Sequence, residues 1–91
     1  MNKYIKSDIE NGTSYLKAGI INALRNIYYE EETEIYLGKF IPLSLILECC
    51  EFFGLNTKLS KEDAFYKIED KEHSIVFIHD LFTGETYIRH D

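Results

Sequence analysis

The sequence predicts an α+β fold in which two N-terminal helices pack on a C-terminal three-stranded antiparallel β-meander. Apolar residues recur at helical spacing as far as Phe53, and after Leu55 they gather in short runs rich in β-branched and aromatic residues. The chain has 91 residues, enough for one hydrophobic core and too few for two. We therefore expect a single domain over residues 1–91.

The first helix is predicted over about residues 8–31. Ser7 and Glu10 match a capping box, which places the helix start at Asp8. One apolar stripe follows at helical spacing, formed by Ile9, Leu16, Ile20, Leu24 and Ile27. The pair Asn11-Gly12 favours a turn, so a start at Thr13 or Ser14 remains an alternative.

The second helix is predicted from Pro42 to Phe53. Pro42 suits a first helical position, and Gly54 followed by Leu55 suits a left-handed terminator. The polar side chains form one narrow stripe, made of Ser44, Glu48 and Glu51. Because the rest of the perimeter is apolar, we expect either a central position for this helix or an oligomer interface at Leu45, Phe52 and Phe53.

Three strands are predicted after Leu55: Phe65–Glu69, His73–His79 and Glu85–His90. The connection between the last two carries a turn signal, since Asp80 can bond the turn backbone and Gly84 supplies a positive φ. Two segments stay ambiguous. Residues 34–40 are either an edge strand or a loop, and residues 60–68 could instead be helical.

The sequence predicts no enzyme, no cofactor and no metal. It contains none of the common nucleophile, phosphate-loop or dinucleotide motifs. Cys49 and Cys50 are adjacent on an apolar helix, which favours buried, reduced and inert thiols. The one geometrically possible metal site joins His73 and His90 with Glu72 or Asp91, at a turn and a chain end that are poorly preorganised.

The charge balance predicts which partners are excluded. Ten Lys and Arg face sixteen Asp and Glu, for a net charge of −6, which disfavours direct binding to nucleic acid. The longest apolar run, residues 40–47, is far shorter than the roughly 18 residues of a membrane span. The N-terminus lacks the apolar run of a secretory signal, so we expect a cytoplasmic protein with no membrane contact.

An acidic cluster marks the predicted end of the first helix, where a helix dipole favours basic residues instead. The cluster comprises Glu30, Glu31, Glu32 and Glu34, and it is flanked by Tyr28, Tyr29 and Tyr36. It is either a solvated loop or an acidic patch that docks on a basic protein surface, with tyrosines as contact residues.

In size, acidity and lack of catalytic motifs, the chain is similar to the small proteins with which phages and mobile elements inhibit host defence, and to toxin-neutralising immunity proteins. This resemblance is one of composition. It implies a non-catalytic inhibitor that occupies a basic, nucleic-acid-binding surface of a larger protein. The alternatives are a homodimeric assembly module and a small-molecule binder with a pocket between the second helix and the sheet, lined by Phe52, Phe53, Tyr66 and Phe77.

Overall fold

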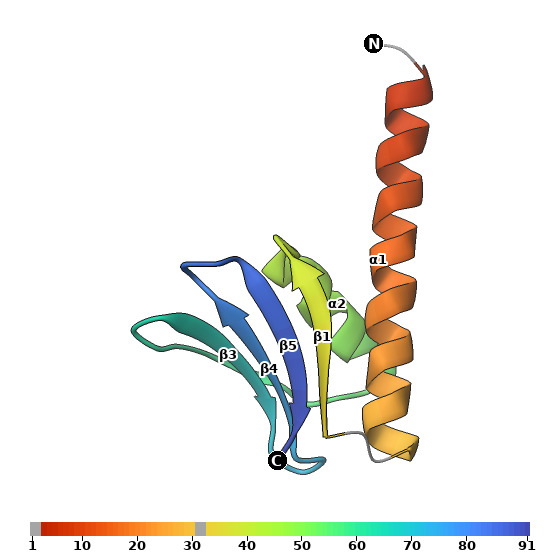
Figure 1. Ribbon diagram of the computed structural model, residues 1–91. Helices are drawn as coiled ribbons and strands as arrows, with labels where there is room; N and C mark the ends of the chain where they lie inside the picture. Colours follow the sequence, from red (N-terminus) through yellow and green to blue (C-terminus); the bar gives the residue numbers. More distant parts are fainter. Residues whose placement is uncertain (1–2, 31–32) are drawn as a thin grey trace.

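The computed structural model describes the backbone of residues 3–30 and 33–91, and the side chains of residues 15–30 and 33–91. Two helices and five strands follow in the order α1 (Lys3–Tyr29), β1 (Glu34–Lys39), α2 (Leu43–Phe53), β2 (Lys58–Lys61), β3 (Phe65–Asp70), β4 (Ile75–Asp80) and β5 (Glu85–His90). The strands form one antiparallel sheet in the order β1-β5-β4-β3-β2 (Figure 1). The predicted α+β class is confirmed, but the sheet has five strands instead of three.

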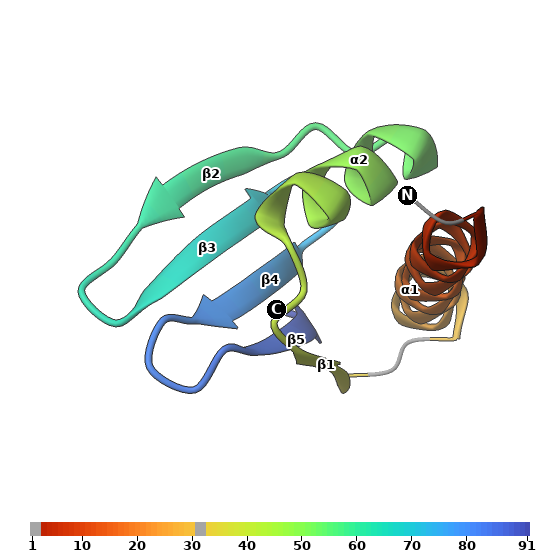
Figure 2. The ribbon, with the colours of Figure 1, turned by 90° about the horizontal axis from the view of Figure 1, so that it is seen from above.

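Both helices pack on the same face of the sheet. The core joins Leu24 and Ile27 of α1 and Ile46 of α2 to Phe77 and Ile88 of the central strands. Seen from above, α2 lies across the sheet and α1 stands beside it, past the β1–β5 edge (Figure 2). Neither α1 nor α2 covers the opposite face, which we call the open sheet face.

Helix α1 begins earlier than predicted. It runs from Lys3 through Asn11 and Gly12 to Tyr29, so the predicted start at Asp8 and the alternative start after Gly12 are both wrong. A glycine inside a helix costs only about 1 kcal/mol relative to alanine, too little to end a helix of 27 residues by itself. The predicted capping side chains, Ser7 and Glu10, lie outside the described side chains. The N-terminal half of α1 projects beyond the rest of the domain (Figure 1).

Both ambiguous segments are strands. Residues 34–39 form β1, which pairs with β5 and carries a bulge between Tyr36 and Gly38, where Gly38 has φ 140°. Residues 58–61 form β2, which pairs with β3, so the helical alternative for residues 60–68 is wrong. These two strands flank the predicted meander at its two edges.

Helix α2 ends as predicted but begins one residue later than predicted. Pro42 has an extended backbone (ψ 135°) and precedes the helix as its N-cap instead of occupying the first helical position, whereas Gly54 closes the helix in the left-handed conformation with φ 86°. The Leu55 amide donates to the Cys50 carbonyl at 2.9 Å, and the Gly54 amide donates to Glu51 at 3.0 Å. These bonds satisfy carbonyls that the helix end would leave unpaired.

The apolar perimeter of α2 is mostly used inside the chain. Leu45, Ile46, Cys49 and Cys50 are buried in the core. Leu45, predicted as an oligomer contact, is only 6% exposed and packs against the protein's own core. Phe52 is the exception, since its side chain is 80% exposed.

The β4–β5 turn forms as predicted. One Asp80 oxygen accepts hydrogen bonds from the amides of Phe82 (2.8 Å) and Thr83 (3.0 Å), and Gly84 has φ 77°. The ring of Phe40 lies so close to Gly84 that a Cβ there would come within 2.7 Å of it. Any other residue at position 84 would meet both this ring and an unfavourable backbone conformation.

Candidate protein-docking surface

Four aromatic side chains gather where the two helices end, and we call them the aromatic cluster: Tyr28, Tyr29, Phe52 and Phe53. Tyr28 packs edge-on against Tyr29 and Phe53, with ring centroids 4.8 Å and 5.7 Å apart. The cluster arises because each helix carries two consecutive aromatic residues in its last turn. Such pairs stabilise the local arrangement by about 0.5–1.5 kcal/mol beyond the area they bury.

Part of this cluster faces solvent. Tyr28 is 43% exposed, Tyr29 69% and Phe52 80%. Monomeric proteins expose single apolar side chains routinely, whereas adjoining exposed aromatics are a feature of interaction surfaces. The aromatic cluster is therefore a candidate contact surface for another molecule.

A groove between α1 and α2 continues from the aromatic cluster, and we call it the interhelical groove. It consists of two adjoining depressions of about 480 and 450 Å³, which share Ile21, Arg25 and Phe52 as lining residues. Lys17 of α1 and Glu48 of α2 form an ion pair of 2.6 Å across one depression. The hydrogen bond to Glu48 raises the pKa of Lys17, so this lysine stays charged.

The acidic cluster adjoins the aromatic cluster along the chain. Glu30 directly follows Tyr29, and Glu34 begins β1; both side chains are exposed. Glu31 and Glu32 lie outside the described residues. Exposed carboxylates beside exposed aromatic rings combine long-range attraction for cations with an apolar contact area.

The structure divides the residues predicted to form one docking patch. Tyr28 and Tyr29 lie together at the end of α1, but Tyr36 belongs to the open sheet face, where its ring lies 5.3 Å from that of Tyr87. Strand alternation places Glu34 on the same face as Tyr36. The two described residues of the acidic cluster, Glu30 and Glu34, thus lie next to two separate aromatic surfaces instead of one.

The other predicted interface and pocket residues separate as well. Phe52 is mostly exposed, Phe53 is half-buried within the aromatic cluster, and Leu45 is in the core. Phe77 is fully buried, so it does not line a pocket with Phe52 between α2 and the sheet as predicted. The two depressions that Phe52 does line belong to the interhelical groove.

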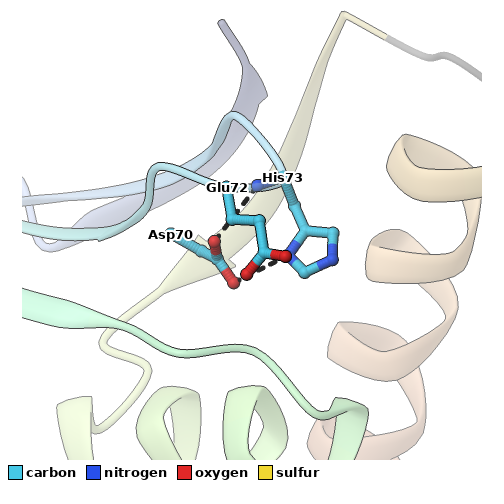
Figure 3. A group of neighbouring side chains, drawn as sticks. All are labelled: Asp70, Glu72 and His73. Carbon is cyan, nitrogen blue, oxygen red and sulfur yellow. Dashed lines mark hydrogen bonds and ion pairs between the residues drawn. The ribbon is translucent and has the colours of Figure 1, made fainter.

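A second polar arrangement lies next to the aromatic cluster, around the buried carboxylate of Asp70 (Figure 3). Asp70 ends β3 and is only 1% exposed. It accepts hydrogen bonds from the Asn56 amide (3.0 Å), the His73 amide (3.1 Å) and His73 Nδ1 (2.9 Å). Because a carboxylate only accepts, Nδ1 of His73 carries the proton in this arrangement. The His73 ring in turn lies 5.3 Å from that of Tyr28.

Burial alone would raise the pKa of Asp70. The hydrogen bonds from His73 and from the Asn56 amide outweigh it and hold the pKa of Asp70 below its usual value. The ionised carboxylate ties the loop after α2 to the turn between β3 and β4. It therefore fixes His73, whose ring lies beside that of Tyr28.

Asp70, Glu72 and His73 also meet a distance criterion for metal binding, since one ligand atom from each lies within 4.8 Å of the others. The donors around Asp70 argue for a structural role instead. Both of its oxygens already accept hydrogen bonds, and a metal would have to displace the proton on His73 Nδ1. The two-histidine site that the sequence made geometrically possible, but did not favour, is not assembled: His73 Nδ1 bonds to Asp70, and His90 lies opposite Ile75 in the sheet.

Sequence reasoning missed the structural role of Asp70 and considered His73 only as a disfavoured metal ligand. Asp70 reads locally as a turn residue, and only its three-residue spacing from His73 signals a side chain that bonds the turn backbone. Sequence reasoning also missed Arg25, one of several dispersed basic residues, which lines the interhelical groove.

The thiols offer no reactive site. Cys49 and Cys50 are free and buried, at 2% and 0% exposure. Burial raises the pKa of both thiols, and for Cys50 it does so to about 12. A thiol that stays protonated near neutral pH is a poor nucleophile and a poor metal ligand.

Comparisons with known proteins leave the fold and the surface as the only guides to function. No protein-family model matches the chain, and neither a curated protein nor a solved structure matches it significantly. Neither helix, as far as it is described, combines the length and apolar character needed to cross a membrane.

Proposed function

We propose that this protein is a non-catalytic protein-binding module that docks through the aromatic cluster and the adjoining acidic cluster. The observation that carries the proposal is the exposure of Tyr29 and Phe52, at 69% and 80%, next to exposed glutamates. Exposed aromatic rings supply most of the binding energy in many interfaces, and rim charges steer the encounter. The partner is a protein that presents an apolar contact ringed by Lys and Arg.

The net charge of −6 supports a more specific role as an inhibitor. A basic surface that binds nucleic acid is attracted to a compact acidic protein by the same charges that attract phosphates. Occupation of such a surface would block its nucleic acid by competition, without any chemical step. The two free thiols, Cys49 and Cys50, suit a reducing compartment such as the cytoplasm.

The test begins with affinity capture of the partner and continues with association and dissociation kinetics at two ionic strengths. The first variant changes Glu30, Glu31, Glu32 and Glu34 to Gln. We expect slower association and a weaker salt dependence, because rim charges act mainly on the encounter rate. The second variant, Phe52→Ala, should increase the dissociation rate about tenfold or more, as for an aromatic anchor.

Phe82→Ala is the matched control. Phe82 is 83% exposed, close to Phe52 at 80%, but it lies in the β4–β5 turn. Its removal should leave both rates unchanged. Wild-type kinetics in the four-Gln variant and in Phe52→Ala would refute this docking surface.

A further inference from the structure

One of the two depressions of the interhelical groove adjoins the aromatic cluster, and we call it the aromatic depression. It has a volume of about 450 Å³ and lies between the last turns of α1 and α2 and the turn that precedes β4. Its apolar lining consists of Ile21, Tyr28, Tyr29, Phe52, Phe53 and Leu55. Small-molecule sites are concave, mostly apolar and of this size, with a few polar groups that orient the ligand. The depression therefore has the size and the walls of a site for one small aromatic molecule.

The inner wall of the aromatic depression is already assembled without a ligand. The ring of Tyr28 lies edge-on against Phe53, with centroids 5.7 Å apart, and 5.3 Å from the ring of His73. A wall that is ordered in advance saves a ligand the entropy cost of arranging it.

Arg25 brings a positive charge to this depression. It forms no ion pair with another described residue, whereas Lys17, which also lines the groove, is paired with Glu48 at 2.6 Å. A guanidinium presents parallel N–H donors that match the two oxygens of a carboxylate. One unpaired cation balances one negative charge, and the net charge of −6 opposes a second negative charge on a ligand. Charge therefore favours a monocarboxylate over a doubly charged phosphate.

His73 brings an oriented hydrogen-bond acceptor to the same depression. The carboxylate of Asp70, which is 1% exposed, accepts a hydrogen bond from His73 Nδ1 at 2.9 Å and thereby holds the ring. The other ring nitrogen, Nε2, points away from Asp70 and toward α1 (Figure 3). A neutral imidazole with its proton on Nδ1 accepts a hydrogen bond at Nε2. A ligand with an N–H or O–H donor is therefore favoured.

We propose that the aromatic depression binds a small aromatic monocarboxylic acid that carries an N–H or O–H donor. The ring of the acid packs against Tyr28 and Phe53, its carboxylate pairs with Arg25, and its donor bonds to Nε2 of His73. This site goes beyond the proposed partner binding, although Tyr28 and Phe52 belong to both surfaces.

The first experiment titrates the wild-type protein with p-hydroxybenzoate and with the longer p-hydroxyphenylacetate, and follows the backbone amide signals by NMR. At least one acid should shift the signals of Arg25, Tyr28 and His73 in a saturable way, with a Kd in the millimolar range or tighter. The absence of saturable shifts with both acids at up to about 10 mM would overturn the proposal. Saturable shifts confined to residues outside the groove would overturn it as well.

Two relatives of the better-binding acid test the polar contacts without changing the protein. Its carboxamide lacks the negative charge and should bind at least about tenfold more weakly, because a hydrogen bond between charged groups is lost. Its methyl ether lacks the O–H donor and should bind at least about threefold more weakly. Unchanged affinity of the carboxamide would refute the pairing with Arg25, and unchanged affinity of the ether would refute the contact with His73.

The second experiment removes the cation from the protein. Arg25→Gln should weaken binding of the same acid at least about tenfold, and it should leave α1 intact because Arg and Gln have similar helix propensities. Lys61→Gln is the matched control, since it changes the net charge equally at an exposed position of β2 and should leave the affinity unchanged. An equal loss in both variants, or no loss in Arg25→Gln, would overturn the proposal. Neither experiment requires the protein partner, so failure here is independent of the proposed function.

Discussion

Asp70 and Phe52 both violate the usual separation of polar and apolar groups, in opposite directions. Asp70 is a carboxylate that is 1% exposed, and Phe52 is an aromatic ring that is 80% exposed. The buried carboxylate is fully supplied with hydrogen-bond donors by its own chain, whereas the exposed ring is largely uncovered by its own chain. The first exception therefore stabilises the fold, whereas the second leaves an apolar ring in contact with solvent.

The largest effect is expected from Asp70→Ala. It leaves the partly buried amides of Asn56 and His73 and the His73 ring without their acceptor, so the free energy of unfolding should fall by about 2–4 kcal/mol. Urea denaturation measures the loss. Labelling of Cys49 and Cys50 provides an independent check, since it requires opening of the core and should accelerate by about 30- to 900-fold for that loss. An unchanged urea midpoint would show that Asp70 has no structural role.

A smaller effect is expected from acidification. The pKa of Asp70 is lowered in the folded state, so its contribution to stability is fully present above the unfolded pKa of about 4. That contribution is lost as the pH falls through the lowered pKa. The pKa values of Asp80 and Asp91 are also lowered, by hydrogen bonds from the turn amides of Thr83 and Phe82 and from Arg89 respectively. Wild type should therefore lose stability in acid.

Asp70→Asn isolates the contribution of Asp70 to this loss of stability in acid. The amide oxygen retains one acceptor but cannot titrate, so this variant should lose less stability than the wild type between about pH 4 and pH 2. Thermal unfolding across that range measures the difference. Parallel curves for the two proteins would assign the acid sensitivity to the other carboxylates.

The smallest effect on stability is expected from Phe52→Ala. Because the ring is mostly in solvent, the free energy of unfolding should change by less than about 0.5 kcal/mol. Phe77→Ala is the contrasting case, since Phe77 is 1% exposed and its truncation should cost about 3–5 kcal/mol. A large loss in Phe52→Ala would mean that the ring supports the fold, which would remove the reason to regard it as a binding residue.

How far the fold could be predicted depended on the range of the interactions involved. Helix α2 and the β4–β5 turn were predictable because Pro42, Gly54, Asp80 and Gly84 act on neighbouring backbone groups. Strand β1 remained one of two alternatives and β2 was not predicted, because each depends on pairing with a strand that is distant or weakly marked in sequence. The short exposed segment at residues 58–61 lacks the alternation of apolar and polar residues that would indicate a strand.

In the candidate site, too, local features were predictable and long-range contacts were not. Tyr28, Tyr29, Phe52 and Phe53 could be named in advance because aromatic residues at helix ends are visible in sequence. Their assembly into one cluster could not, since it depends on how α1 lies beside α2. The role of Asp70 was equally hidden, because two of its donors belong to the adjacent turn and the third comes from the loop after α2.

Strand β2 bears on how this protein avoids aggregation. As an edge strand it presents unpaired backbone groups, which could template the growth of a fibril by adding the sheet of another molecule. Its four residues are all exposed, and lysines stand at both ends, Lys58 and Lys61. An incoming β2 would have to bring its own lysines alongside these. Charge repulsion between the lysines of two such edges therefore opposes edge-to-edge association of this protein at high concentration.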